Sequence, residues 1–142
     1  MKIIIISEGK HGNGRVIAEE LMGIVKDSGR EAHIYSVEDV KPEKIQEGDL
    51  YVFVSPTHAM GPSRKMKKAV EKGLFPENGA YGLITISKKQ KRKTARKMEK
   101  YLEKRGLSKE VENLHLLEDK KGNLKKGFRD ELEKFYGMIE SH

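Results

Sequence analysis

The chain has 142 residues, of which 36% are hydrophobic and 36% charged, with no cysteine and a formal net charge of +7. This length suits a single domain, 1–142, with a buried core, and the lack of cysteine excludes disulfides, thiol catalysis, iron–sulfur clusters and thiolate metal sites. No apolar run reaches the length of a signal peptide or a membrane span, so we expect a cytoplasmic protein with no membrane partner.

The first stretch combines a strand, a glycine-rich loop and the start of a helix. Residues 3–6 are four isoleucines, as expected for a strand buried on both faces of a parallel sheet. A polar loop containing Gly9, Gly12 and Gly14 follows, and from Val16 the apolar residues take helical spacing. Such a loop directs several backbone N–H groups toward one place, which favours binding of an anion.

Strands and helices alternate along the rest of the chain. Further strands are predicted at 32–36, 50–54, 81–86 and 111–117. Helices are predicted from 16 to about 28, over 64–72, within the basic segment 87–105 and from 128 onward, with at most a short helix starting at Pro42. This alternation predicts an α/β fold with helices on both faces of a parallel sheet.

The first loop resembles the phosphate loop of flavodoxin-like proteins. Residues 3–18 align with the strand, turn and helix start of that family without a gap. Gly12 and Asn13 match the Gly-Asn pair of the family, whereas Gly9 and Gly14 stand where it usually has Ser or Thr. The backbone donors are therefore kept, and the side-chain hydroxyl donors are absent.

Two later loops extend this resemblance over nearly the whole chain. Ser55-Pro56-Thr57 resembles the Ser-Pro-Thr turn of the family, and His58 takes the position of an aromatic residue that packs on the flavin. The loop after the fourth strand begins Ser87-Lys88-Lys89 and has no aromatic residue. The resemblance implies a three-layer, doubly wound fold with a five-stranded parallel sheet in the order 2-1-3-4-5, where ligands bind beyond strands 1 and 3.

The resemblance also implies an FMN-binding protein that acts in electron transfer. Backbone amides of 9–15 would bind the phosphate, with 55–61 and 87–89 on either side of the isoalloxazine ring. The expected cofactor-binding residues are Ser7, Gly9, Lys10, His11, Gly12, Asn13, Gly14, Arg15, Ser55, Pro56, Thr57, His58, Ala59, Met60, Gly61, Ser87, Lys88 and Lys89. Two alternatives remain open: an FMN-dependent NAD(P)H or quinone-type reductase with a small-molecule acceptor, and a flavin-free module that interacts through its basic helix.

No catalytic residue and no metal site are predicted. The glycines of 9–14 follow the order Gly-x-x-Gly-x-Gly, which differs from that of a dinucleotide site. His11 and His58 could meet above the sheet, but Glu8 is the one further ligand in view. We therefore assign these histidines to the surface or to contact with the ring.

The excess positive charge lies in one segment, 87–105. This segment has ten basic and two acidic residues, a net charge of +8, and the remainder of the chain has a net charge of −1. Three interpretations are open: a solvated face whose lysine stems cover the edge of the core, a docking surface for an acidic redox protein, or a nucleic-acid site. Nucleic acid ranks below an acidic partner, because no aromatic residue lies between Lys88 and Lys100 for base stacking.

Overall fold

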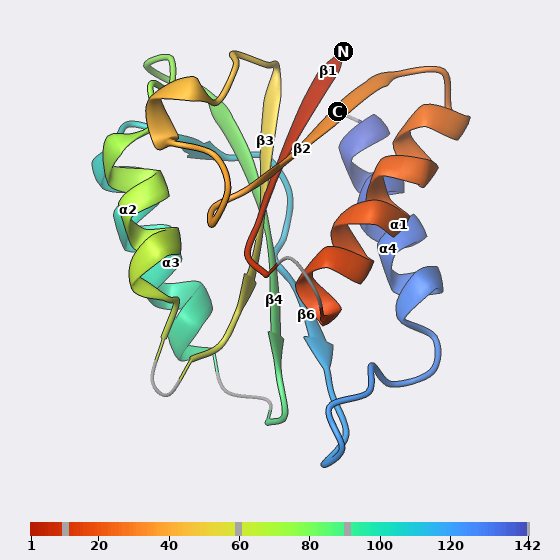
Figure 1. The fold of residues 1–142 in the computed structure, drawn as a ribbon. Coiled ribbons are helices and arrows are strands. Elements are labelled where there is room, and N and C mark those ends of the chain that lie inside the picture. Colours follow the sequence, from red (N-terminus) through yellow and green to blue (C-terminus); the bar gives the residue numbers. More distant parts are fainter. Residues whose placement is uncertain (10–11, 59–60, 90–91, 142) are drawn as a thin grey trace.

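The computed structural model describes residues 1–9, 12–58, 61–89 and 92–141 (Figure 1). Strands and helices alternate in it as predicted. In chain order the elements are β1 (Lys2–Ser7), α1 (Asn13–Asp27), β2 (Glu31–Ser36), the 3-10 helix η1 (Pro42–Lys44), β3 (Leu50–Pro56), α2 (Arg64–Lys72), β4 (Ala80–Ser87), α3 (Lys93–Lys104), β5 (Ser108–Lys109), β6 (Leu114–Leu117) and α4 (Phe128–Glu140).

The sheet is parallel, and its order is β2-β1-β3-β4-β5, with β6 also paired to β4. The predicted order 2-1-3-4-5 is confirmed, but the prediction of one continuous fifth strand at 111–117 was wrong. Its place is taken by two short pieces: β5 pairs with the beginning of β4, and β6 pairs with its end. The chain between them leaves the ladder where Val111 packs over Gly82, which has no side chain to fill that space.

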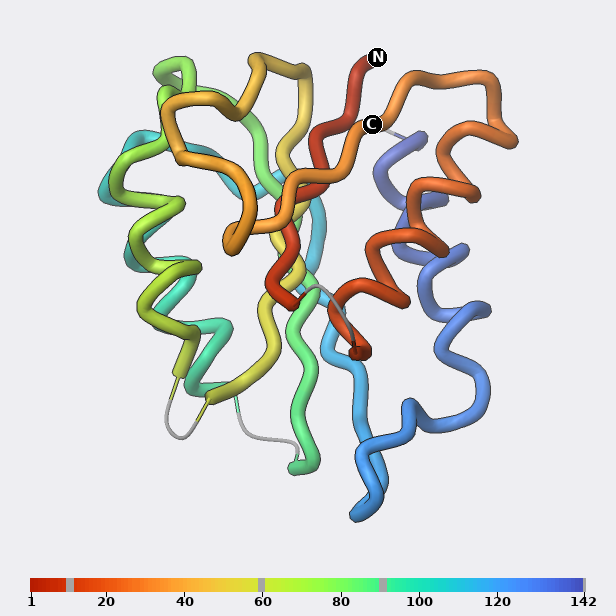
Figure 2. The backbone as a smooth tube through the Cα atoms, in the orientation of Figure 1, coloured from red at the N-terminus to blue at the C-terminus, as the bar shows by residue number. Residues whose placement is uncertain are grey.

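Two helix layers cover the two faces of this sheet. Helices α1 and α4 lie on one face and α2 and α3 on the other, as the ribbon and the tube show (Figures 1 and 2). The four isoleucines of β1 serve both layers, because successive side chains of a strand point to opposite faces. Ile3 and Ile5 belong to the core under α1 and α4, while Ile4 and Ile6 belong to the core under α2 and α3.

Local signals in the sequence set the ends of the helices. The Ser63 hydroxyl accepts a hydrogen bond from the Met66 N–H at 3.0 Å, so it caps α2, whose predicted bounds 64–72 are confirmed. Gly29 and Gly106 follow α1 and α3 with φ of 84° and 82°, a conformation that glycine adopts readily. Among the described residues, no helix combines the length and the apolar character that crossing a membrane requires.

Because the strands are parallel, their carboxyl ends meet at one edge of the sheet. Helices α1, α2 and α3 each begin at this edge, at the lower end of the molecule in Figure 1. The loops that follow β1, β3 and β4 therefore share the edge, as the sequence analysis expects.

Candidate functional site

The floor of the candidate site is formed by the ends of β1 and β3, which are neighbours in the sheet. The hydroxyls of Ser7 and Ser55 and one carboxylate oxygen of Glu8, Oε1, are buried there. None of these three oxygens has a hydrogen-bond partner among the described residues. Buried polar groups in proteins are normally paired, so these oxygens suit a polar ligand bound above the strand ends.

Glu8 and His58 form a contact across this floor. The Nε2 atom of His58 bonds to Oε2 of Glu8, and the Glu8 side chain is 7% exposed while that of His58 is 55% exposed. A buried carboxylate is costly unless it is paired, so Glu8 holds the imidazole at the mouth of the site. The stacking of His58 on a flavin ring stays a prediction.

In the first loop, one backbone N–H that was expected to bind phosphate already donates a hydrogen bond to a carboxylate of the protein. The Gly9 N–H donates to Oε1 of Glu38 at 2.7 Å, and the Ser36 hydroxyl donates to the other oxygen of the same carboxylate. The start of α1 has no side-chain cap, so its first N–H groups keep their capacity for an anion. The backbone N–H groups that remain available in this loop therefore lie at the start of α1 rather than at Gly9.

Two glycines of the loop are required for different reasons. Gly12 has φ of 110°, and a Cβ built on it would meet open space, which leaves room for a ligand against the helix N-terminus. A Cβ on Gly14 would clash with the carbonyl oxygen of Glu8 and lie 3.4 Å from Cγ of Pro56. Gly14 is thus explained by packing of the chain against itself rather than by space for phosphate.

The side chains of Asn13 and Arg15 are bound to other parts of the protein. The Asn13 amide donates to the Glu118 carboxylate and, at 2.7 Å, to the carbonyl of Gly122. Arg15 pairs with Glu19 one turn further along α1, at 2.8 Å. The charge of Arg15, one of the expected cofactor-binding residues, is therefore partly offset.

The second loop is closed by its own backbone. His58 and Gly61 exchange hydrogen bonds, from the His58 N–H at 2.7 Å and from the Gly61 N–H at 2.9 Å. The Thr57 hydroxyl accepts a bond from that of Thr94, the second residue of α3, at 2.9 Å, so the loop is tied to the α3 layer. The predicted residues Lys10, His11, Ala59 and Met60 lie outside the described residues.

The loop after β6, residues 118–124, joins the site, and the sequence analysis did not include it. This loop accepts the hydrogen bonds from Asn13. Its Lys120 carbonyl also accepts a hydrogen bond from the Lys88 ammonium, at 3.4 Å. Within this loop the Asp119 carboxylate accepts backbone bonds from Lys121 and Asn123, which hold its pKa below the ordinary value. The position of 118–124 after the last parallel strand was the signal that could have found it.

In the third loop, Ser87 is directed toward the chain itself. Its hydroxyl donates to the Lys89 carbonyl and lies 3.0 Å from Nε2 of His115 on β6. Both lysine side chains of this loop are exposed. Lys89 makes no ion pair with another described residue, so its charge is free to act on a ligand.

The chain is similar in part to a curated protein and over its whole length to solved structures. No protein-family model matches the chain. The alpha-component of the NADPH sulfite reductase flavoprotein of Blochmanniella floridana is 36% identical over 75 residues, which is 53% of this chain. The matched residues cover 12% of the length of that curated relative, so the match concerns a small part of it.

Solved structures align over the whole chain. A flavodoxin from Streptococcus pneumoniae TIGR4 superposes with a TM-score of 0.81 and 17% identity, covering 99% of both chains. Oxidised flavodoxin 1 from Bacillus cereus superposes with a TM-score of 0.78 and 14% identity, covering 100% of this chain and 99% of the other. An archaeal flavodoxin gives a TM-score of 0.76 and 15% identity, with 99% and 98% covered. The chain therefore has the flavodoxin-like fold.

Proposed function

We propose that this protein binds FMN and transfers electrons. The observation that carries the proposal is the N-terminus of α1, where Gly12 provides no side-chain cap, together with the buried oxygens of Ser7 and Ser55, which have no partner among the described residues. A helix N-terminus without a cap favours a phosphate, and unpaired oxygens at a topological switch point favour a polar ligand. The flavodoxin-like fold and the flavoprotein relative support the same assignment.

In this proposal the chain binds the two ends of FMN in different ways. Backbone N–H groups of 12–15 hold the phosphate, and Glu38 keeps Gly9 in place by accepting its N–H. The ring lies between His58 on one side and the loop 87–89 on the other. FMN supplies the redox chemistry when it is bound, and the protein orients the ring and sets its electrostatic surroundings.

Two opposed charges tune the affinity of such a ring for electrons. The Glu8 carboxylate beneath the site disfavours the gain of negative charge, while the exposed Lys89 favours it. We expect Glu8→Gln to raise the midpoint potential of the bound flavin and Lys89→Gln to lower it, by a smaller amount because solvent screens an exposed charge. Potentiometric titration of both variants measures this, and shifts of the same sign would contradict it.

We further propose that the electron partner is a protein with an acidic docking face. Helices α2 and α3 together carry ten basic side chains, and all ten are exposed. Exposed charge of one sign steers a partner of opposite charge and makes its association rate depend on salt. A cytoplasmic location remains a prediction alongside this one.

A pair of matched variants tests FMN binding. Gly12→Val and Gly29→Val place the same side chain at a positive φ, at opposite ends of α1, and both built Cβ positions face open space. Gly12, with φ 110° and ψ −171°, lies in a region essentially restricted to glycine, so its backbone penalty exceeds that at Gly29, and circular dichroism is used to show that Gly12→Val is folded. Of the two positions, only Gly12 lies at the site. We expect titration of the apoprotein with FMN to show binding by the wild type and by Gly29→Val and none by Gly12→Val. Equal binding by the two variants would overturn the assignment of the phosphate loop.

A second assay separates a carrier from an enzyme. FMN-loaded protein is mixed with NADPH or NADH and a quinone, and nucleotide oxidation is followed by absorbance. A carrier gives no turnover without a separate reductase, whereas steady turnover would favour the FMN-dependent reductase. Purified protein that binds no FMN would instead leave the flavin-free module as the function.

A further inference from the structure

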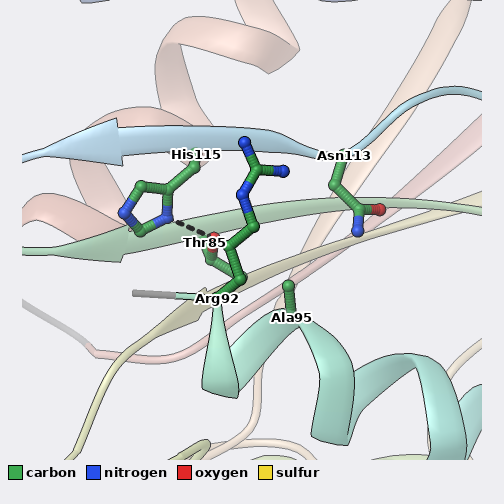
Figure 3. A pocket seen from close by; sticks show the side chains of 5 residues that line it. All are labelled: Thr85, Arg92, Ala95, Asn113 and His115. Atoms are coloured by element: carbon green, nitrogen blue, oxygen red, sulfur yellow. Dashed lines mark hydrogen bonds between the residues drawn. The ribbon is translucent and has the colours of Figure 1, made fainter. Parts of the chain in front are cut away.

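A second polar pocket adjoins the third loop of the candidate flavin site, because His115, which lines it, contacts Ser87 and Lys89. It lies on the face of the sheet that α3 covers. It has a volume of about 180 Å³ and is lined by Thr85 of β4, Arg92 and Ala95 at the start of α3, and Asn113 and His115 at the beginning of β6 (Figure 3). None of these residues belongs to the expected FMN site, so the inference below does not rest on the proposed function.

The pocket results from two local changes: the side chains of β4 become polar, and the fifth strand is interrupted. Along β4, the side chains facing α3 change from the apolar Tyr81 and Leu83 to Thr85 and Ser87. The fifth strand is interrupted between β5 and β6, so Asn113 lies outside the ladder. The small side chain of Ala95, where α3 crosses this region, fills little of the space that results.

The polar groups of the pocket are mostly hydrogen-bond donors. Figure 3 shows the guanidinium of Arg92 between the side chains of His115 and Asn113. Within the described parts of the chain, no carboxylate pairs with Arg92 and none lines the pocket. Oδ1 of Asn113 is buried without a partner, and the other end of the same amide is a donor. Since α3 has no side-chain cap, its first N–H groups add to this set.

His115 is held in one orientation by hydrogen bonds on both ring nitrogens. Nδ1 lies 2.7 Å from the Thr85 hydroxyl, and Nε2 lies 3.0 Å from that of Ser87. Ser87 donates its own proton to the Lys89 carbonyl, so it accepts from Nε2–H, and Thr85 donates to Nδ1 of the neutral ring.

From this arrangement we propose that the pocket binds a small oxyanion, the phosphate or carboxylate group of a small molecule. A guanidinium with a free fork of N–H groups matches such an anion in shape and charge. The amide of Asn113 supplies a further donor. A cation is disfavoured, because Arg92 brings positive charge and no lining residue is acidic.

The test follows the ring signals of His115 and the amide signals of Asn113 by NMR while the protein is titrated at constant ionic strength. Inorganic phosphate is used in one titration, acetate in a second and chloride in a third. We expect saturable shifts with phosphate or acetate and none with chloride; the anion that saturates identifies the group. Failure of both phosphate and acetate to saturate would overturn the proposal.

Variants distinguish this pocket from surface charge and from the flavin loop. Arg92→Gln is expected to weaken binding by at least about tenfold, because hydrogen bonds to charged groups are the strong ones. Lys93→Gln removes the same charge from the next position, which is exposed like Arg92 but does not line the pocket, and it should change affinity less than about twofold. Asn113→Asp, which puts a carboxylate into the pocket, should abolish binding.

Gly12→Val removes the anion site of the first loop and should leave the shifts at His115 unchanged. Loss of those shifts in Gly12→Val would place the anion at the flavin loop and overturn the proposal. If Arg92→Gln and Lys93→Gln weaken anion binding equally, general surface charge explains the binding. That result would also overturn the proposal.

Discussion

The two helix layers cover one sheet and have opposite charge. Helices α2 and α3 carry ten basic and three acidic side chains, a net charge of +7, whereas α1 and α4 carry four basic and seven acidic ones, a net charge of −3. Their inner faces are alike, because both pack apolar residues against the same strands. The fold therefore fixes the inner faces and leaves the charge of each outer face free to serve a function.

The layers also differ in how their charges are used. In the α1 and α4 layer, basic side chains pair with neighbouring carboxylates, as Arg15 does with Glu19 and Arg129 with Glu20. In the part of the α2 and α3 layer that the structure describes, no basic side chain is paired with a carboxylate. The acidic layer is thus partly neutralised internally, while the basic layer presents its charge to solvent and to partners.

Helix starts repeat this contrast. Asp130 and Glu131 lie in the first turn of α4, where they complement the helix dipole, but the first turn of α2 contains Arg64 and Lys65 and no acidic residue. Positive charge at a helix N-terminus is unfavourable for stability.

Replacing a buried side chain of either layer by alanine should have the largest effect on stability. It also tests whether the two layers, which differ in surface charge, share one cooperative core. Phe135 of α4 and Leu102 of α3 are both buried. We expect Phe135→Ala to lower the free energy of unfolding by about 3–5 kcal/mol and Leu102→Ala by about 2–5 kcal/mol. Urea unfolding followed by circular dichroism should show one transition in both variants. Separate transitions for the two layers would show that they are not one cooperative unit.

Charge reversal in one layer at a time sharpens the comparison. A triple variant of Lys93, Arg96 and Lys100 to Glu is matched by a triple variant of Arg15, Lys26 and Lys134 to Glu, so the net charge changes equally. Retention on a polyanionic resin is measured for both variants relative to the wild type. The α3 variant should lose more retention, and the α1 and α4 variant should lose less than about half as much, because a clustered charge acts locally. Equal losses would mean that net charge alone determines binding.

Exchanging the signs of the helix starts should give a smaller effect. Arg64→Glu is expected to raise the free energy of unfolding by about 0.3–1 kcal/mol, and Asp130→Lys to lower it by a similar amount, because each changes the charge next to a helix N-terminus. Denaturant titration at low salt measures both. If high salt leaves these differences unaltered, they do not arise from the dipole.

The smallest effect concerns the ion pair between Glu99 of α3 and Lys109 of β5, whose charged groups are 2.7 Å apart. The hydrogen bond to Glu99 raises the pKa of Lys109 above its ordinary value of 10.5. The stabilisation is therefore fully present below pH 10.5 and is lost as the pH rises through the higher folded-state value. Lys109→Gln should cost less than about 1 kcal/mol near pH 7, as for other surface pairs. This difference from the wild type should shrink in unfolding experiments above pH 10.5; a constant difference would exclude the pair as its cause.

Patterns that depend on local chemistry could be predicted from the sequence. The isoleucines of β1 and the bounds 64–72 of α2 each depend on signals within a few residues, and the structure has them where they were expected. The interruption of the fifth strand could not be predicted in this way, because it depends on Val111 meeting Gly82 of another strand.

Part of the candidate site escaped prediction for a similar reason. Glu8 follows directly on a buried strand, but its importance depends on a contact with His58, fifty residues away in sequence. The bond from Gly9 to Glu38 and the bonds from Asn13 to the loop 118–124 are likewise long-range. A loop pattern shows which backbone groups are available, whereas the tertiary structure decides which of them are already used.

The interruption of the fifth strand also affects how this protein meets other chains. An open strand at the edge of a sheet is a template for pairing with a strand of another molecule, and long flat edges promote aggregation. Here the edge beside β4 offers two short pieces, of two and four residues, and Lys109 is charged. Intermolecular strand addition is thereby hindered on this side, so contacts made here depend on side chains rather than on extension of the sheet.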